Sequence, residues 1–178
     1  MNKTFPQPDQ QPVSDADVLR LADVKTESIS RLLSKYGVKL ILVAQSEEIP
    51  GSYWGDEEAG LIDNDLLVRP DTPLHSILHE TCHYICMDQG RREGLNTDAG
   101  GDYDEENAVC FLQILLADHI EGFDRARMFK DMDTWGYTFR LGSAQAWFER
   151  DAEDARAWLL KRKLITQTPQ PNWSLRKD

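Results

Sequence analysis

Three histidines and a glutamate within LHSILHETCHYIC (residues 74–86) have the residue types and spacing for metal chemistry. The chain has four histidines, and His75, His79 and His83 all lie in this segment. On an α-helix each residue turns by about 100°, so His79 and His83 face one point, as two ligands of a tetrahedral zinc ion must. Glu80 projects beside them. HETCH therefore has the His-Glu-x-x-His pattern in which the glutamate deprotonates a zinc-activated water.

The residues around HETCH bear on whether the pattern is accidental. A five-residue pattern occurs by chance, and two nearby histidines can simply be core or surface residues. Here PLHSIL and YIC flank the motif and are apolar at helical spacing, which predicts a buried helix. Buried histidines need polar partners or a metal, since an unsatisfied buried polar group is costly. This context favours the metal-binding interpretation.

A third ligand is predicted on a helix running from about Glu105 to Ile120. Glu105 shares one helical face with an apolar series, whereas Glu106 points about 100° away from that face. A carboxylate aimed at a core is expensive unless it is paired or bound to metal. Glu105 is therefore the candidate, although an exposed first-turn acid stabilised by the helix dipole is the alternative. The apolar series consists of Ala108, Val109, Leu112, Leu115 and Leu116.

HETCH followed 22 residues after His83 by Glu105-Glu106-Asn107-Ala108 resembles the gluzincin metallopeptidases, which combine HExxH with a glutamate in E-x-x-A on a later helix. Within these, the chain is most similar to the small ImmA/IrrE-type and minigluzincin domains, over about residues 14–116. The resemblance implies an α+β peptidase domain acting on a peptide or protein substrate. It also implies that His79, His83 and Glu105 bind Zn²⁺ and that Glu80 is the general base.

Other residues near the motif have more than one possible role. His75 could support a ligand, contact substrate, satisfy the helix start or bind the metal directly, and we favour a supporting or helix-start role. Cys82 and Cys86 could join a His/Cys zinc site, but free cysteines are commonly small buried hydrophobes. Cys110 is expected to be a packing residue. A non-catalytic zinc module, with Cys82, Cys86 or His75 in the fourth position, is thus the alternative to a peptidase.

Amide hydrolysis also needs a donor for the developing oxyanion. Tyr103, His119 and Tyr137 are the candidates, and their positions in the chain do not distinguish them. Asp98, Asp102 and Asp104 lack calcium-loop spacing, so we expect a solvated acidic loop. Tyr53 and Trp54 could line a substrate cleft or cover the core.

The elements that must position these residues predict a single α+β domain. Strands come early and helices late, with no strand–helix alternation, which favours a small α+β domain. The gluzincin resemblance implies a small, mostly antiparallel twisted sheet packed on an N-terminal helix, the motif helix and the glutamate helix. We predict a flexible tail at 1–13, the domain at 14–165 and an irregular tail at 166–178. Within the domain we predict a helix capped by Ser14, a buried strand at 38–44, a strand or hairpin at 60–68, the HETCH helix capped by Thr72, a helix near 123–132 and one at 143–164.

Composition narrows the cellular setting. The net charge of -11 argues against nucleic acid or an anionic membrane as the main partner. No apolar run reaches the roughly 18 residues of a membrane span, and the first thirty residues lack a signal-peptide core. Three cysteines without a disulfide-framework spacing suit a reducing compartment. We therefore expect a cytoplasmic protein, while the oligomeric state is not indicated.

Overall fold

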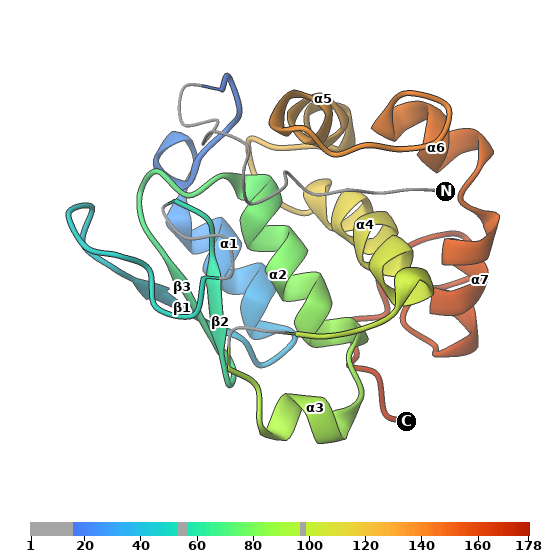
Figure 1. Cartoon of the computed structure of the whole chain (residues 1–178), viewed down its shortest axis with the longest axis horizontal. Helices are drawn as coiled ribbons and strands as arrows, with labels where there is room; N and C mark the ends of the chain where they lie inside the picture. The colour runs from blue at the N-terminus through green and yellow to red at the C-terminus, as the bar shows by residue number, and fades with distance from the viewer. Residues whose placement is uncertain (1–15, 53–56, 97–98) are drawn as a thin grey trace.

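The computed structural model describes residues 16–52, 57–96 and 99–178 (Figure 1). The predicted tail at 1–13, the Ser14 cap, Tyr53, Trp54 and Asp98 lie outside these residues. The elements in chain order are the 3₁₀ helix η1 (Leu21–Asp23), α1 (Thr26–Ser34), β1 (Lys39–Leu42), β2 (Gly60–Ile62), β3 (Asp65–Val68), α2 (Leu74–Cys86), α3 (Gln89–Glu93), α4 (Tyr103–Ala117), α5 (Arg125–Trp135), α6 (Ala144–Arg150) and α7 (Glu153–Lys161).

The predicted α+β class is confirmed, and the sheet is mixed. Its strand order is β1-β3-β2, in which β3 pairs in parallel with β1 and antiparallel with β2. The segment 60–68 is thus a hairpin, one of the two expected forms. Its turn contains Asp63 in a left-handed conformation (φ 52°), a conformation that aspartate tolerates better than most residues. β1 is an edge strand with Leu42 60% exposed, so the prediction of a buried strand was wrong.

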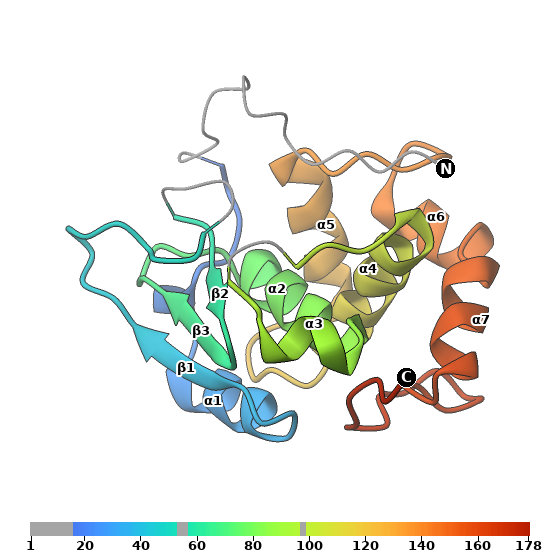
Figure 2. The ribbon, with the colours of Figure 1, turned by 60° about the horizontal axis from the view of Figure 1, so that its bottom comes forward.

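Helix α2 lies in the middle of the molecule. The sheet and α1 lie to one side of it, and α4 runs beside it on the other, with α5, α6 and α7 beyond (Figures 1 and 2). Of its 13 residues, all but Glu80 and Tyr84 are buried. This burial confirms the prediction of a buried motif helix and explains why its sequence is apolar on nearly every face.

The first helix is shorter than predicted because the preceding backbone has other partners. The amides of Leu21 and Ala22 donate to the carbonyls of Thr72 and Pro70, and Leu74 N donates to Leu19 O. This segment, which includes η1, ties the N-terminal side of the domain to the start of α2. A continuous α-helix through it would use the Leu21 and Ala22 amides within the helix and forfeit those bonds, so α1 begins only at Thr26.

Two other helix boundaries differ from the prediction. Pro73, not Thr72, is the N-cap of α2, and the Thr72 hydroxyl accepts from Arg69 N instead. The expected helix at 143–164 is two helices, α6 and α7, separated at Asp151 and Ala152. The Asp151 carboxylate pairs with Arg140, which holds the chain at this break. None of the helices in the described residues is both long and apolar enough to span a bilayer.

The central position of α2 leads to a stability prediction. Leu78 on α2 is fully buried, so Leu78→Ala is expected to lower the free energy of unfolding by about 2–5 kcal/mol. The matched change Leu42→Ala on the exposed edge strand should cost less than about 1 kcal/mol. Urea denaturation followed by circular dichroism measures both. Equal losses in the two variants would contradict the central role of α2.

Candidate metal centre

Helix α2 presents the motif side chains from a buried face. His79, Glu80 and His83 offer ligand atoms that all lie within 4.8 Å of one another. The His79 and His83 rings are 4.6 Å apart between centroids and nearly perpendicular. Both rings are buried. The predicted convergence of the three side chains is therefore present in the fold.

Helix α4 brings a carboxylate to the two histidines. Glu106 Oε1 lies 3.1 Å from His83 Nε2, and Glu106 Oε2 lies 3.9 Å from His79 Nε2. The Glu106 side chain is 29% exposed, so the cluster is close to solvent and not sealed in the core. A carboxylate facing two imidazole nitrogens is balanced by protons or by a shared cation. The α2 and α4 side chains together thus form a candidate cation site.

Glu105, the sequence-predicted ligand, points elsewhere. Its carboxylate lies 2.7 Å from Arg91 Nη2 and 3.2 Å from Arg176 Nη1. It is only 4% exposed, so the burial expected from its helical face is present. The compensating partners are two arginines. This geometry argues against Glu105 and for Glu106 as the carboxylate that belongs with the histidines.

Gln113 orients His79. Its amide oxygen Oε1 lies 2.7 Å from His79 Nδ1, and its amide nitrogen donates to the carbonyl of His75 at 3.3 Å. The second bond fixes which end of the amide is oxygen, so His79 Nδ1 must carry the hydrogen. The lone pair of His79 is then on Nε2, the nitrogen nearer to Glu106. Neutral imidazole with one nitrogen held by a hydrogen bond is the usual form of a metal ligand.

Sequence reasoning missed both Glu106 and Gln113, although a signal was present. They are seven residues apart, which is two helical turns, so they share one face of α4. Gln113 also interrupts the apolar run FLQILL, and a polar residue there needs a buried partner. The face of Glu105 was predicted to be functional because apolar residues share it, although Glu106 and Gln113 together mark a second, polar face.

His75 is part of the support around the site. Its Nδ1 is hydrogen-bonded to the Tyr137 hydroxyl at 3.1 Å, and its ring lies 4.9 Å from that of Trp135. Burial, helped by the positive charge of Arg20, lowers the pKa of His75 to about 3. The ring is therefore neutral at physiological pH. This position fits the favoured prediction of a supporting residue better than direct ligation.

Tyr137 is the oxyanion candidate that lies near the cluster. Its ring centroid is 6.0 Å from that of His79, and burial keeps the pKa of its hydroxyl well above the usual value, so it stays a donor. Tyr103 is 47% exposed at the start of α4. His119 packs on Trp173, away from the motif.

The cysteines belong to the core. Cys82, Cys86 and Cys110 are fully buried, and burial raises the pKa of the Cys82 and Cys86 thiols. Within the described residues, the potential metal cluster of His79, Glu80 and His83 contains none of the three cysteines. Asp102, placed in an acidic loop by the sequence, caps α4 by accepting from Glu105 N at 2.9 Å, while Asp104 is exposed.

A second carboxylate, Glu58, lies within electrostatic range of Glu80. Its Oε1 accepts from the Trp135 indole nitrogen at 3.1 Å. Burial is the main reason that the pKa of Glu58 is raised to about 7, and the negative charges of Glu80 and Glu57 add to it. Near neutral pH this carboxyl is therefore partly protonated.

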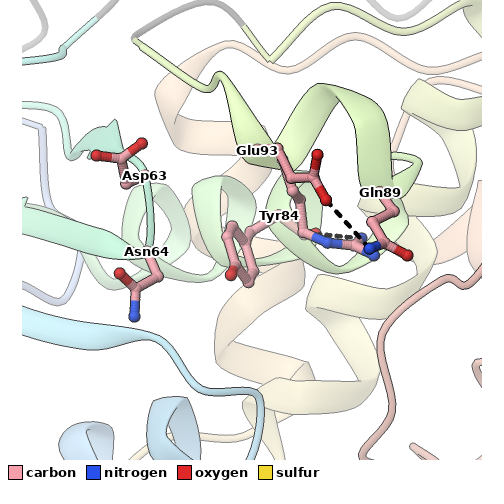
Figure 3. Close-up of a pocket in the computed structure, with 6 residues that line it drawn as sticks. Asp63, Asn64, Tyr84, Gln89 and Glu93 are labelled. Carbon is pink, nitrogen blue, oxygen red and sulfur yellow. Dashed lines mark hydrogen bonds between the residues drawn. The ribbon is translucent and has the colours of Figure 1, made fainter.

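A pocket of about 330 Å³ lies beside the last turn of α2 (Figure 3). Tyr84, next to His83 in the chain, lines it together with residues of the β2–β3 turn and α3. Figure 3 shows the hydrogen bond between Gln89 and Glu93 at its rim. None of its lining residues belongs to the histidine cluster, so the pocket and the candidate metal centre are separate. The lining residues are Asp63, Asn64, Tyr84, Gln89, Arg92 and Glu93.

The raised pKa of Glu58 predicts a pH-dependent stability. A carboxyl whose pKa rises from 4.5 in the unfolded chain to about 7 in the folded protein stabilises the fold below pH 4.5, and this contribution is lost as the pH rises through 7. Glu58→Gln should remove this loss, on the order of 2 kcal/mol, because the amide cannot ionise yet can still accept from Trp135. Urea unfolding at pH 5 and pH 8 measures the difference. An identical pH dependence in parent and variant would contradict the shifted pKa.

Comparisons with known proteins do not assign this chain to a family. No protein-family model, curated protein or solved structure matches the chain. The arrangement of His79, Glu80, His83 and Glu106 is therefore the basis for assigning a function.

Proposed function

We propose that this chain is a zinc-dependent peptidase in which His79, His83 and Glu106 hold the metal and Glu80 is the general base. The observation that carries the proposal is the meeting of the Glu106 carboxylate with both motif histidines. HExxH alone supplies two ligands and a base. A carboxylate from a second helix completes the two-histidine, one-carboxylate set typical of catalytic zinc sites.

The distances fit such an ion. Bonds of about 2.0–2.1 Å in a tetrahedral site place neighbouring ligand atoms about 3.4 Å apart. The Glu106–histidine distances are 3.1 Å from Oε1 to His83 Nε2 and 3.9 Å from Oε2 to His79 Nε2, so they involve different carboxylate oxygens, and each lies within about 0.5 Å of that value. The donor set, two imidazoles and one carboxylate, suits zinc and leaves a fourth position for water or substrate.

The chain's own residues then supply the acid–base chemistry. A bound zinc ion would lower the pKa of water and polarise a peptide carbonyl. Glu80, one residue after the first ligand, accepts the proton from the attacking water and returns it to the leaving nitrogen. Gln113 holds His79 in the tautomer that presents Nε2, and Tyr137 is the nearest hydroxyl donor from the sequence-predicted set.

The gluzincin resemblance supports this proposal with one change. The resemblance rests on HETCH and on E-x-x-A, Glu105 to Ala108, and the fold places each of them on a helix. It implied Glu105 as the ligand, whereas the geometry favours Glu106, which lies outside that pattern because Val109 stands three residues after it. A peptide or protein is proposed as the substrate because an activated water, a general base and a nearby donor are the components that amide hydrolysis requires.

The ligand assignment predicts zinc content. At saturating Zn²⁺ the parent chain is expected to hold one ion, and Glu106→Ala is expected to hold none because one of three ligands is lost. Glu105→Ala should still hold one, since that carboxylate faces arginines. Equilibrium dialysis with elemental mass spectrometry gives the ratio. Zinc retained by Glu106→Ala and lost by Glu105→Ala would return the ligand role to Glu105, and a parent without zinc would refute the metal site.

The base assignment predicts a separation of binding from catalysis. Glu80→Gln should keep the zinc but lower cleavage of a mixed peptide library by about 10²–10⁴-fold, because the amide cannot accept a proton. Asp104→Asn, which changes an exposed acid on α4, is the matched control and should cleave like the parent. Mass spectrometry of the products measures the rates. Unchanged cleavage by Glu80→Gln would overturn the role of Glu80 as the general base. A parent chain that needs zinc to fold but cleaves no peptide would indicate the non-catalytic zinc module.

A further inference from the structure

The last residues of the chain are packed across the end of the site-bearing helices. In the segment 171–178, Trp173 has a left-handed conformation (φ 57°) and its ring contacts Tyr36, Lys35 and His119. The segment has neither helix nor strand, and these contacts tie it to the domain. Arg176 lies three residues after Trp173 in this anchored segment.

Arg176 binds the last turn of α2. Its backbone amide donates to the carbonyl of Ile85 at 3.0 Å, and its Nη1 donates to the carbonyl of Cys86 at 3.2 Å. The last carbonyls of a helix have no partner within the helix, so a cation there satisfies them and interacts favourably with the helix dipole. His83 lies less than one turn before these carbonyls. Arg176 thereby fixes the end of the helix that carries a proposed ligand.

The same guanidinium binds the start of α4. Arg176 Nη1 lies 3.2 Å from Glu105 Oε2. Arg91 approaches the same carboxylate with distances of 2.9 and 2.7 Å from Nη2 to its two oxygens. Gly101 (φ 103°) leaves room for this contact, because a Cβ at that position would lie 2.8 Å from Glu105 Oε1. Glu105 is thus buried between two cations that come from different parts of the chain.

Holding Glu105 also determines where Glu106 points. Adjacent residues of a helix are separated by about 100° around its axis, so a carboxylate fixed on the arginines sets the rotation of the first turn of α4. With Glu105 on the arginines, Glu106 and Gln113 face His83 and His79. A rotation or fraying of this turn would move Glu106 away from His83.

We infer that Arg176 is a positioning residue for the metal centre, joining the end of α2 to Glu105 so that Glu106 meets the motif histidines. The inference rests on the proposed function, since it assigns Arg176 a role in binding the same metal. In the described contacts Arg176 binds Glu105 and the end of α2 and touches none of His79, His83 and Glu106. Its effect is therefore on metal affinity, through the geometry of α4.

The test compares zinc affinity in variants of the full chain. Arg176→Met keeps an unbranched side chain against Trp158, whose ring lies 5.4 Å from the guanidinium carbon, but removes the guanidinium. We expect zinc affinity to fall by about tenfold or more, the effect typical of losing a group that orients a metal ligand. Competition with a zinc-chelating fluorophore measures the dissociation constant without any peptidase assay.

Two controls separate this role from general destabilisation. Lys177→Met removes a neighbouring exposed charge from the same segment. Arg125→Met removes an arginine–carboxylate pair of 2.7 Å, with Asp118, that lies outside the site. Both should bind zinc like the parent. Far-UV circular dichroism of the metal-free proteins, with their thermal unfolding, establishes that the variants compared are folded.

A double-mutant cycle identifies the route of the effect. If Arg176 acts through Glu105, then Arg176→Met combined with Glu105→Gln should weaken zinc binding less than the sum of the two single changes in free energy. Glu105→Gln alone, which keeps the side-chain shape, should also weaken binding, and it provides the test if Arg176→Met does not fold.

The outcomes separate this inference from the proposed function. Zinc bound equally tightly by the parent and a folded Arg176→Met would overturn the positioning role and leave the metal centre intact. For an unfolded Arg176→Met, parent-like affinity in Glu105→Gln would overturn it in the same way. A parent chain that binds no zinc would refute the proposed function, and the inference with it.

Discussion

The structure depends on one requirement, the need to satisfy polar side chains inside the contact between α2 and α4. Helix α2 is buried along almost its whole length, yet it carries three histidines toward its neighbours. Each buried imidazole has a named partner from another element: Tyr137 for His75, Gln113 for His79 and Glu106 for His83. Two of these partners, Glu106 and Gln113, come from α4, whereas the other residues of α4 from Ala108 to Ala117 are apolar and buried. An interior without these partners would leave costly unpaired groups.

Two adjacent carboxylates at the start of α4 are separated by their partners. Glu105 turns toward Arg91 and Arg176, and Glu106 turns toward the histidines. Adjacent acids would repel each other if they shared one environment. Placing one among arginines and the other beside imidazoles, or a cation bound to them, resolves that repulsion and gives the helix a defined rotation. Asp102 reinforces it by capping the same turn.

The surroundings of the candidate centre favour neutral and protonated groups. His75 is kept neutral by burial, Tyr137 is kept protonated, and the pKa of Glu58 is raised to about 7. Glu58 and Tyr137 lie within electrostatic range of Glu80, the proposed base, so their protonated forms add no negative charge near it. The Glu106 carboxylate faces His79 and His83, and in the proposed reaction an activated water and a peptide carbonyl would be bound beside this cluster.

The sequence by itself determined the features that depend on local periodicity. HETCH at a spacing of four places His79, Glu80 and His83 together on any α-helix, and the apolar flanks require that helix to be buried. The α+β class, a strand or hairpin at 60–68 and the helix beginning near Glu105 also follow from local patterns, since turn residues and apolar spacing act over a few residues.

Only the tertiary structure decided which glutamate faces the histidines. Residues 105 and 106 differ by one step of about 100°, so the choice depends on how α4 is rotated against α2. That rotation is fixed by Arg91 and by Arg176, which lies 71 residues after Glu105 and has no local sequence signal that links the two. The same limit applies to β1 and to the residues before α1, whose burial and conformation depend on strand order and on pairing with residues 70–74. Local patterns specify the elements and the faces that need partners, and long-range contacts select the partners.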